Sequence, residues 1–118
     1  MTYKDDCIFC KIAAGEILST VIYEDDDVIA FEDANPQTPV HTLLIPKDHY
    51  SSISDEVPAE LLGKLFSKVS EVAALKGVDE NGFRVIVNKG TDGRQTVFHL
   101  HIHILGGTTM PISMGPAD

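Results

Sequence analysis

The sequence predicts an α+β fold in which a five-stranded antiparallel sheet is combined with one long and one short helix. Two observations support this class. The strand-like segments are short and follow one another in hairpin-like pairs, and the helical patterns stand apart instead of alternating strictly with strands. The chain has 118 residues, of which 43% are hydrophobic, and it contains no internal repeat or linker. We therefore expect one domain over residues 1–118.

The first expected element is a short amphipathic helix within residues 7–15. Its apolar residues recur at helical spacing: Ile8, Phe9, Ile12 and Ala13. Gly15 follows them, at a place where a left-handed helix end favours glycine. Three strands are expected next, over Val21–Tyr23, Val28–Phe31 and His41–Ile45. An acidic turn joins the first two as a hairpin, and a proline-containing segment separates them from the third.

The long helix has the clearest pattern in the sequence. Pro58 lies near its first turn and Gly77 marks its end. One apolar stripe runs between them: Leu61, Leu62, Leu65, Phe66, Val69, Val72 and Ala73. The last two strands are expected over Phe83–Asn88 and Val97–Leu105, joined by a glycine-containing loop. Residues 108–118 are expected to form an extended tail.

Three histidines alternate strictly with branched apolar residues in the last expected strand: His99, His101 and His103. A period of two places them on one face of a strand, while Leu100, Ile102 and Ile104 face the core. For one histidine, a polar outer face would be the simplest explanation. Thr, Lys or Glu would serve such a face equally well, so three in register favour chemistry. The strand can hold a metal, or it can present one imidazole as a nucleophile.

The loop before the histidines has the composition of an anion-binding nest. Residues 88–96 combine glycines, which allow close backbone approach, with N–H groups and a hydroxyl. By itself the loop is explained as an ordinary long hairpin connection. Beside three histidines, it predicts a phosphate cradle.

Charge and hydropathy exclude other classes of function. The net charge of -9 argues against binding to nucleic-acid polymers, which depends on clustered Lys and Arg. No apolar run approaches the roughly 20 residues that cross a bilayer, and the first residues lack the hydrophobic region of a signal peptide. We expect a cytoplasmic protein with no membrane partner. In that reducing compartment, Cys7 and Cys10 predict metal or redox chemistry, or packed thiols, rather than a structural disulfide.

The pattern that begins at His99 resembles the signature of the histidine-triad (HIT) superfamily of nucleotide hydrolases and transferases. The Gly106-Gly107 pair that follows is similar to the Hint branch, the purine nucleoside phosphoramidases. The resemblance covers nearly the whole chain, and the other matching segments are 7–12, 30–33, 36–41 and 44–47. It implies the HIT fold and a purine nucleotide as substrate.

The resemblance also implies catalytic roles. His101 would attack the α-phosphorus of a nucleoside monophosphate derivative and form a nucleotidyl-histidine intermediate, which water would hydrolyse. His103 would stabilise charge or deliver a proton, and His41 and Asn88 would support the reaction. An imidazole with an unperturbed pKa of about 6.5 is mostly neutral at cytoplasmic pH, so this nucleophile would need no lowered pKa.

A nucleotide-binding set is implied in the same way. Asp33 would accept hydrogen bonds from ribose hydroxyls, and Phe31 would wall the base. The implied set is Phe31, Asp33, Asn88, Gly93, Gln95, Thr96, Val97, His101 and His103. Thr96 stands where Hint proteins more usually have serine, and the chain lacks the tryptophan common near their C-terminus, which bears on leaving-group preference.

Cys7 and Cys10 supply half of a tetrahedral zinc site. Zinc-bearing relatives in the superfamily imply His49 and His99 as the other two ligands. With four protein ligands a zinc ion has no open position, so we expect a structural ion beside metal-free catalysis.

The resemblance further implies a homodimer whose two sheets join. Three other functions stay open on the residues alone: a dinucleoside polyphosphate hydrolase, a nucleotide-sensing or partner-binding module with little turnover, and a metal carrier that uses the histidine strand.

Overall fold

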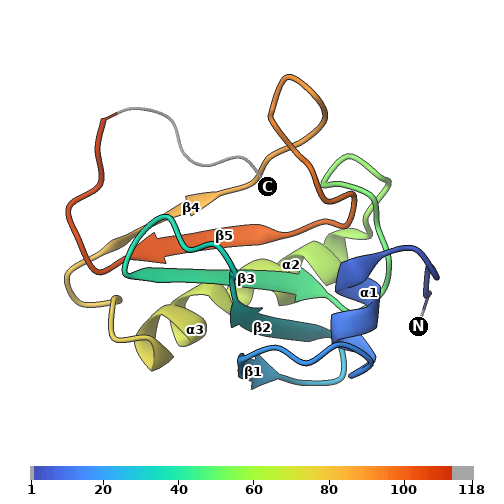
Figure 1. Ribbon diagram of the computed structural model, residues 1–118, viewed down its shortest axis with the longest axis horizontal. Helices are drawn as coiled ribbons and strands as arrows, with labels where there is room; N and C mark the ends of the chain where they lie inside the picture. Colours follow the sequence, from blue (N-terminus) through green and yellow to red (C-terminus); the bar gives the residue numbers. More distant parts are fainter. Residues whose placement is uncertain (1, 113–118) are drawn as a thin grey trace.

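The computed structural model describes residues 2–112; Met1 and residues 113–118, where most of the expected tail falls, lie outside the described residues. Five strands form one antiparallel sheet in the order β1-β2-β3-β5-β4 (Figure 1). The strands are β1 (Val21–Glu24), β2 (Val28–Glu32), β3 (Val40–Pro46), β4 (Phe83–Ile86) and β5 (Ile102–Gly106). The helices are α1 (Ile8–Ala13), α2 (Ala59–Ser67) and α3 (Val69–Leu75). The predicted fold class is confirmed.

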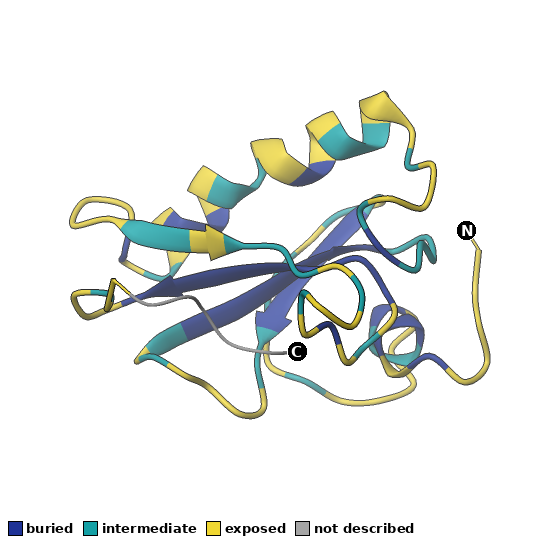
Figure 2. Ribbon diagram, turned by 90° about the horizontal axis from the view of Figure 1, so that it is seen from above, coloured by how far each residue is buried: buried dark blue, intermediate teal, exposed yellow. Residues whose placement is uncertain are grey.

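The two faces of the sheet carry different layers, because successive side chains of a strand point to opposite faces. Figure 2 shows α2 and α3 lying across one face and α1 on the other. The buried cluster on the α2 and α3 side includes Ala30, Leu44, Leu65, Val72, Leu100, Ile102 and Ile104. The cluster on the α1 side includes Phe9, Ile29, Phe31, Leu43 and Ile45. As predicted, Leu100, Ile102 and Ile104 belong to the core.

The expected long helix is present as α2 and α3, which are joined at Lys68. The Lys68 N–H donates to the carbonyl of Leu65 over 3.2 Å, a tightened turn, while its backbone keeps helical angles. Gly77 follows the last turn with a φ of 74°, a left-handed conformation that glycine adopts without strain. The sequence signals at both ends of this helix were therefore correct.

Two expected strands are shorter in the structure. β5 begins at Ile102 instead of Val97, because the Leu100 N–H donates to the Tyr50 carbonyl over 2.6 Å, outside the sheet. β4 ends at Ile86 instead of Asn88, because Ile86 already pairs with His103 and the neighbouring strand begins one residue before it. The prediction that His99 and His101 lie within the strand is thus wrong, although the face on which they lie is preserved.

Smaller differences concern α1 and the remaining strands. Ile8 belongs to the predicted apolar stripe of α1, yet this residue is 49% exposed. β1, β2 and β3 begin and end within one residue of their expected bounds. No helix in residues 2–112 is long and apolar enough to cross a membrane.

Candidate active site

Three histidines gather where β5 begins. His103 lies in β5 opposite Leu43 of β3, His101 lies just before the strand, and His41 lies near the start of β3. The ring centroids of His101 and His103 are 5.0 Å apart, and those of His41 and His103 are 5.2 Å apart. All three side chains are buried. The structure therefore brings together the three histidines for which the HIT resemblance implies catalytic roles.

His101 is held in one tautomer. Its Nδ1 lies 2.7 Å from the backbone carbonyl oxygen of His99. A carbonyl oxygen can only accept, so Nδ1 carries the proton and Nε2 keeps its lone pair. That Nε2 is buried and has no hydrogen-bond partner within residues 2–112. The result is an oriented imidazole with an available lone pair, as a nucleophile requires.

Two consecutive hydrogen bonds determine the tautomers of the His41 and His103 rings. The Gln37 N–H donates to His41 Nδ1 over 3.0 Å, so His41 carries its proton on Nε2. This Nε2 lies 2.9 Å from Nδ1 of His103, which must accept. Neutral His103 therefore carries its own proton on Nε2. The Nε2–H of His103 is therefore a hydrogen-bond donor on the ring next to His101.

Asp33 completes the histidine cluster. It follows β2, and its N–H donates to the His41 carbonyl over 3.0 Å. One carboxylate oxygen accepts from the Asn35 N–H at 2.8 Å, and the other lies 3.3 Å from Nε2 of His41. The side chain is only 8% exposed. Asp33 thus contacts the histidine pair, and its contact with a ribose stays a prediction.

Burial lowers the pKa of each of these histidines, because desolvation disfavours the charged ring. For His41 and His101 the nearby Asp33 carboxylate opposes the effect without cancelling it. The pKa of His103 falls to about 3, through burial first and then through the neighbouring His101 and His41. The rings are neutral at pH 7. Burial lowers the pKa of His101, and the expectation that a nucleophile here needs no lowered pKa stays a prediction.

The loop between β4 and β5 is braced by Gln95. This buried amide accepts from the Gly90 N–H at 3.0 Å and donates to the carbonyls of Ser51, at 2.8 Å, and Val97, at 3.0 Å. A Cβ at Gly93 would lie 2.5 Å from the Lys89 carbonyl oxygen, so only glycine fits there. The loop is therefore tightly closed rather than open.

The other residues implied to bind the nucleotide lie in or next to this loop or in the cluster on the α1 side of the sheet. Thr96 is exposed, Val97 packs against the cluster on the α1 side, and Asn88 is half-buried just beyond β4. Phe31 is buried, with the ring of Phe9 edge-on at 5.4 Å. Direct contacts of these residues, and of Gly93 and Gln95, with a nucleotide stay predictions.

The four residues proposed as metal ligands meet at one place. The ligand atoms of Cys7, Cys10, His49 and His99 all lie within 4.8 Å of one another. Nδ1 of His99 is 3.3 Å from Sγ of Cys7 and 3.5 Å from Sγ of Cys10, and Nδ1 of His49 is 3.3 Å from Sγ of Cys10. Bonds of about 2.0–2.3 Å to a tetrahedral zinc ion require donor separations of this size. The three printed separations of 3.3–3.5 Å match this geometry, and the donor types are those that zinc prefers.

The second nitrogen of His99 supports this assignment. Nε2 lies 2.8 Å from the Pro46 carbonyl, so it carries the proton and leaves the lone pair of Nδ1 aimed at the thiols. Such an outer hydrogen bond is the usual way to orient a histidine ligand. Burial raises the pKa of the Cys10 thiol to about 11 and lowers that of His99 to about 4.

Sequence reasoning missed Phe9 and the backbone groups that fix the rings. Phe9 lies between the two cysteines on α1, and its ring meets His101 edge-on at 5.2 Å. Its position inside the C-x-x-C segment was the available signal. The Gln37 N–H and the carbonyls of Pro46 and His99 have no such sequence signal, because these groups occur in the backbone of almost every residue.

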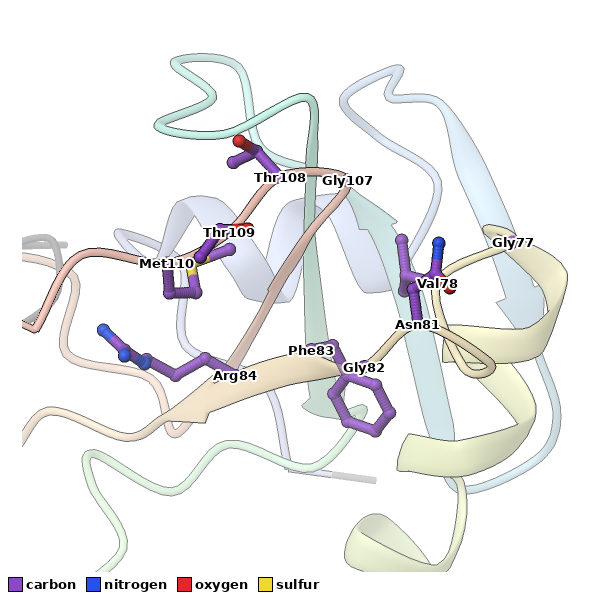
Figure 3. Close-up of a pocket in the computed structure, with 10 residues that line it drawn as sticks. All are labelled: Gly77, Val78, Asn81, Gly82, Phe83, Arg84, Gly107, Thr108, Thr109 and Met110. Atoms are coloured by element: carbon purple, nitrogen blue, oxygen red, sulfur yellow. The ribbon is translucent and has the colours of Figure 1, made fainter.

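Two of the hollows in the described part of the chain have linings that do not include His41, His101 or His103. One of about 270 Å³ borders the expected metal centre and the loop; its lining is Lys4, Asp6, Cys7, Ile8, His49, Thr96, Val97 and Phe98. Figure 3 shows another, of about 630 Å³, beside Arg84 and Met110 at the end where β4 begins. Its lining contains none of the histidines, and nothing in it resembles the chemistry of the site.

Fold and site together define a small α+β protein with a histidine cluster at a central strand and a paired-cysteine site beside it. A model of the HIT domain matches residues 14–110. The chain belongs to the HIT family.

Named relatives agree with this membership. The chain is 50% identical over 104 residues to Protein HitA of Neisseria gonorrhoeae, which covers 86% of this chain and 96% of that protein. It is 48% identical over 109 residues to a 14 kDa zinc-binding protein of Brassica juncea, with 89% and 96% covered. The structure of a HIT family hydrolase from Clostridium thermocellum superimposes with a TM-score of 0.89 at 43% identity, covering 94% and 98%.

Proposed function

We propose that this protein hydrolyses nucleoside 5′-phosphoramidates, or related conjugates of nucleoside monophosphates, as the Hint branch does. The observation that carries the proposal is the buried Nε2 of His101, whose lone pair is fixed by the Nδ1 bond to the His99 carbonyl. A similar structure that is named a HIT family hydrolase supports the reaction class.

In the proposed mechanism, the lone pair of His101 Nε2 attacks the α-phosphorus and the bond from phosphorus to the leaving nitrogen breaks. The Nε2–H of His103 donates to a phosphoryl oxygen as negative charge develops there. One water molecule is consumed in all. It gives a proton to the leaving nitrogen as the P–N bond breaks. The hydroxide that remains then attacks phosphorus, and the Nε2–P bond breaks to release the nucleoside monophosphate.

Binding of the substrate is assigned to the elements around the cluster. Asp33 would accept from the ribose hydroxyls, and the loop residues Gly93, Gln95, Thr96 and Val97 together with Asn88 would hold the phosphate. Phe31 would support the base from within the core.

Zinc fits the set of Cys7, Cys10, His49 and His99, and a relative is named a zinc-binding protein. We propose that these four residues hold a structural zinc ion. With four protein ligands, it would cross-link α1 to the chain before β5 and supply no open position for chemistry.

A homodimer is part of the same proposal. β4 is an edge strand of the sheet, and edge strands present unpaired backbone groups. Three large apolar residues on β4, α2 and α3 are exposed: Val85 at 37%, Phe66 at 39% and Leu75 at 58%. Sedimentation equilibrium tests it, since a mass of one chain at micromolar concentration would contradict a stable dimer.

The activity is tested by assaying adenosine 5′-phosphoramidate and a diadenosine polyphosphate side by side, with His101→Ala as the control. We expect faster hydrolysis of the phosphoramidate and a loss on the order of 1,000-fold or more in the variant. Equal rates in wild type and variant would exclude His101 as the nucleophile. Preference for the polyphosphate would favour a dinucleoside polyphosphate hydrolase, and tight nucleotide binding without turnover would favour a sensing module.

A further inference from the structure

His99 and His101 are two residues apart, yet they belong to different centres. The His99 ring faces the thiols of Cys7 and Cys10 at 3.3 and 3.5 Å. The backbone carbonyl of the same residue accepts the proton of His101 Nδ1 at 2.7 Å. One peptide unit therefore links the proposed metal centre to the proposed nucleophile.

The backbone of this peptide unit is not held by the sheet. β5 begins only at Ile102, so the ladder ends before His101. The chain just before β5 is held instead by the bond from Leu100 N–H to Tyr50 and by the His99 ring, whose Nε2 donates to the Pro46 carbonyl. The position of the His99 carbonyl consequently depends both on the Leu100 bond to Tyr50 and on how firmly the His99 ring is anchored.

Phe9 forms a second link. It lies on α1 between the two cysteines, and its ring meets both histidines edge-on, at 6.0 Å from His99 and 5.2 Å from His101. An ion bound to Cys7 and Cys10 would fix α1 against His99. The same ion would thereby fix the aromatic wall of His101.

We propose that the metal centre positions the nucleophile. An ion held by Cys7, Cys10, His49 and His99 anchors the His99 peptide and Phe9, and these two keep His101 in the single tautomer that attacks phosphorus. His99 is therefore a positioning residue as well as a ligand, and loss of the ion slows the reaction without the ion touching the substrate. The catalytic consequence rests on the proposed function, whereas the effect on the His101 ring does not.

His49 offers the most selective test, because it is the ligand whose ring has no contact with His101 or Phe9 among those seen in residues 2–112. His49→Ala removes one ligand, and His49→Cys replaces it with a thiolate, since three cysteines and one histidine are also a common zinc set. Val78→Ala is the matched control. The buried Val78 side chain lies beside Gly106, at the far end of β5, so the cavity weakens the fold away from both centres.

Three quantities are measured for each protein: bound zinc by elemental analysis, the imidazole ¹H–¹⁵N spectrum of His101, and kcat with KM for the phosphoramidate. We expect His49→Ala to lose zinc and to show a mixture of His101 tautomers in place of the Nδ1–H form. Its kcat should fall about 10- to 100-fold, with KM changed far less, because a misplaced reacting group costs rate rather than binding. His49→Cys should restore all three.

The opposite results are equally clear. A folded, zinc-free His49→Ala protein with the wild-type His101 spectrum would overturn the proposal, and so would a wild-type protein that binds no zinc. The same spectral change in Val78→Ala would overturn it too, because the effect would then be general loosening. If His49→Ala does not fold, the spectrum of the wild type is recorded after chelation and again after zinc is returned. If the wild type has no phosphoramidase activity, the proposed function fails while the spectra still decide this inference.

Discussion

The Nε2 of His41 lies 2.9 Å from the Nδ1 of His103, and the Gln37 N–H on the far side of His41 determines which of them donates. A backbone amide thus sets the proton positions of two side chains in succession. The proton that remains on Nε2 of His103 is the one expected to contact the phosphoryl group. Both rings are buried, so water does not compete for these bonds.

Replacing His41 with phenylalanine tests this chain. His41→Phe keeps a ring of similar size but leaves Nδ1 of His103 without its donor. We expect stability to fall by about 1–3 kcal/mol, the usual cost of a buried unpaired polar group. The activity should fall at least tenfold. Urea unfolding and steady-state kinetics check both, and a variant with unchanged stability and rate would show that the 2.9 Å contact carries no energy.

Stability should depend on pH between about 5 and 7. The pKa of His103 is lowered to about 3 by burial, whereas an unfolded histidine titrates near 6.5. Below pH 6.5 the unfolded chain therefore binds a proton that the folded chain does not, so stability is full above this pH and is lost as the pH falls. From pH 6.5 to 5 the loss is about 2 kcal/mol for each histidine that stays neutral.

Urea unfolding of the chelated protein at a series of pH values measures this slope. His41 and His101, whose pKa values are also lowered by burial, add to it in the same direction. His103→Gln should reduce the slope by about one proton. Stability that does not vary between pH 5 and 7 would contradict burial of neutral histidines.

Gly93→Ala should disrupt the loop between β4 and β5. The added Cβ would lie 2.5 Å from the Lys89 carbonyl oxygen, so the backbone must move. We expect kcat/KM to fall about 10- to 100-fold as the loop is displaced. The matched control is Gly63→Ala in α2, where a Cβ meets nothing within 4 Å and should stabilise the helix by about 0.5–1 kcal/mol. Equal kcat/KM values in the two variants would show that the loop between β4 and β5 does not contribute to the reaction.

Zinc binding should release protons. The pKa of the Cys10 thiol is raised to about 11 by burial in the metal-free protein, so the thiol is protonated at pH 7 and must lose its proton to become a ligand. Calorimetric titration with zinc in buffers of different ionisation enthalpy measures the number released. Affinity should rise with pH between 6 and 8. Binding without proton release would mean that Cys10 is not a ligand.

The periodicities of the sequence predicted every strand and helix, because burial of apolar faces dominates their formation. The α2 and α3 stripe and the alternation of Leu100, Ile102 and Ile104 show this most clearly. The boundaries of β5 were predicted less well. The alternation continues back to His99, but the Leu100 N–H bonds to Tyr50, and no local pattern encodes a bond across 50 positions.

The sequence patterns predict which residue types form the candidate site, but not which nitrogen atoms carry its protons. Alternation placed His101 and His103 on one face, and spacing brought Cys7 and Cys10 together. Which nitrogen carries each proton depends on the Gln37 N–H and the His99 carbonyl. Every residue except proline carries the same backbone N–H and carbonyl groups, so only the folded chain reveals which of them take part.

The late start of β5 divides the alternating histidines between two sets of partners. The His99 ring contacts Cys7, Cys10 and His49. The His103 ring contacts His41 and His101 instead. A substitution among Cys7, Cys10 and His49 should therefore disturb the ring of His101 first, through the His99 peptide and Phe9. A substitution at His41 should instead disturb the ring of His103 first.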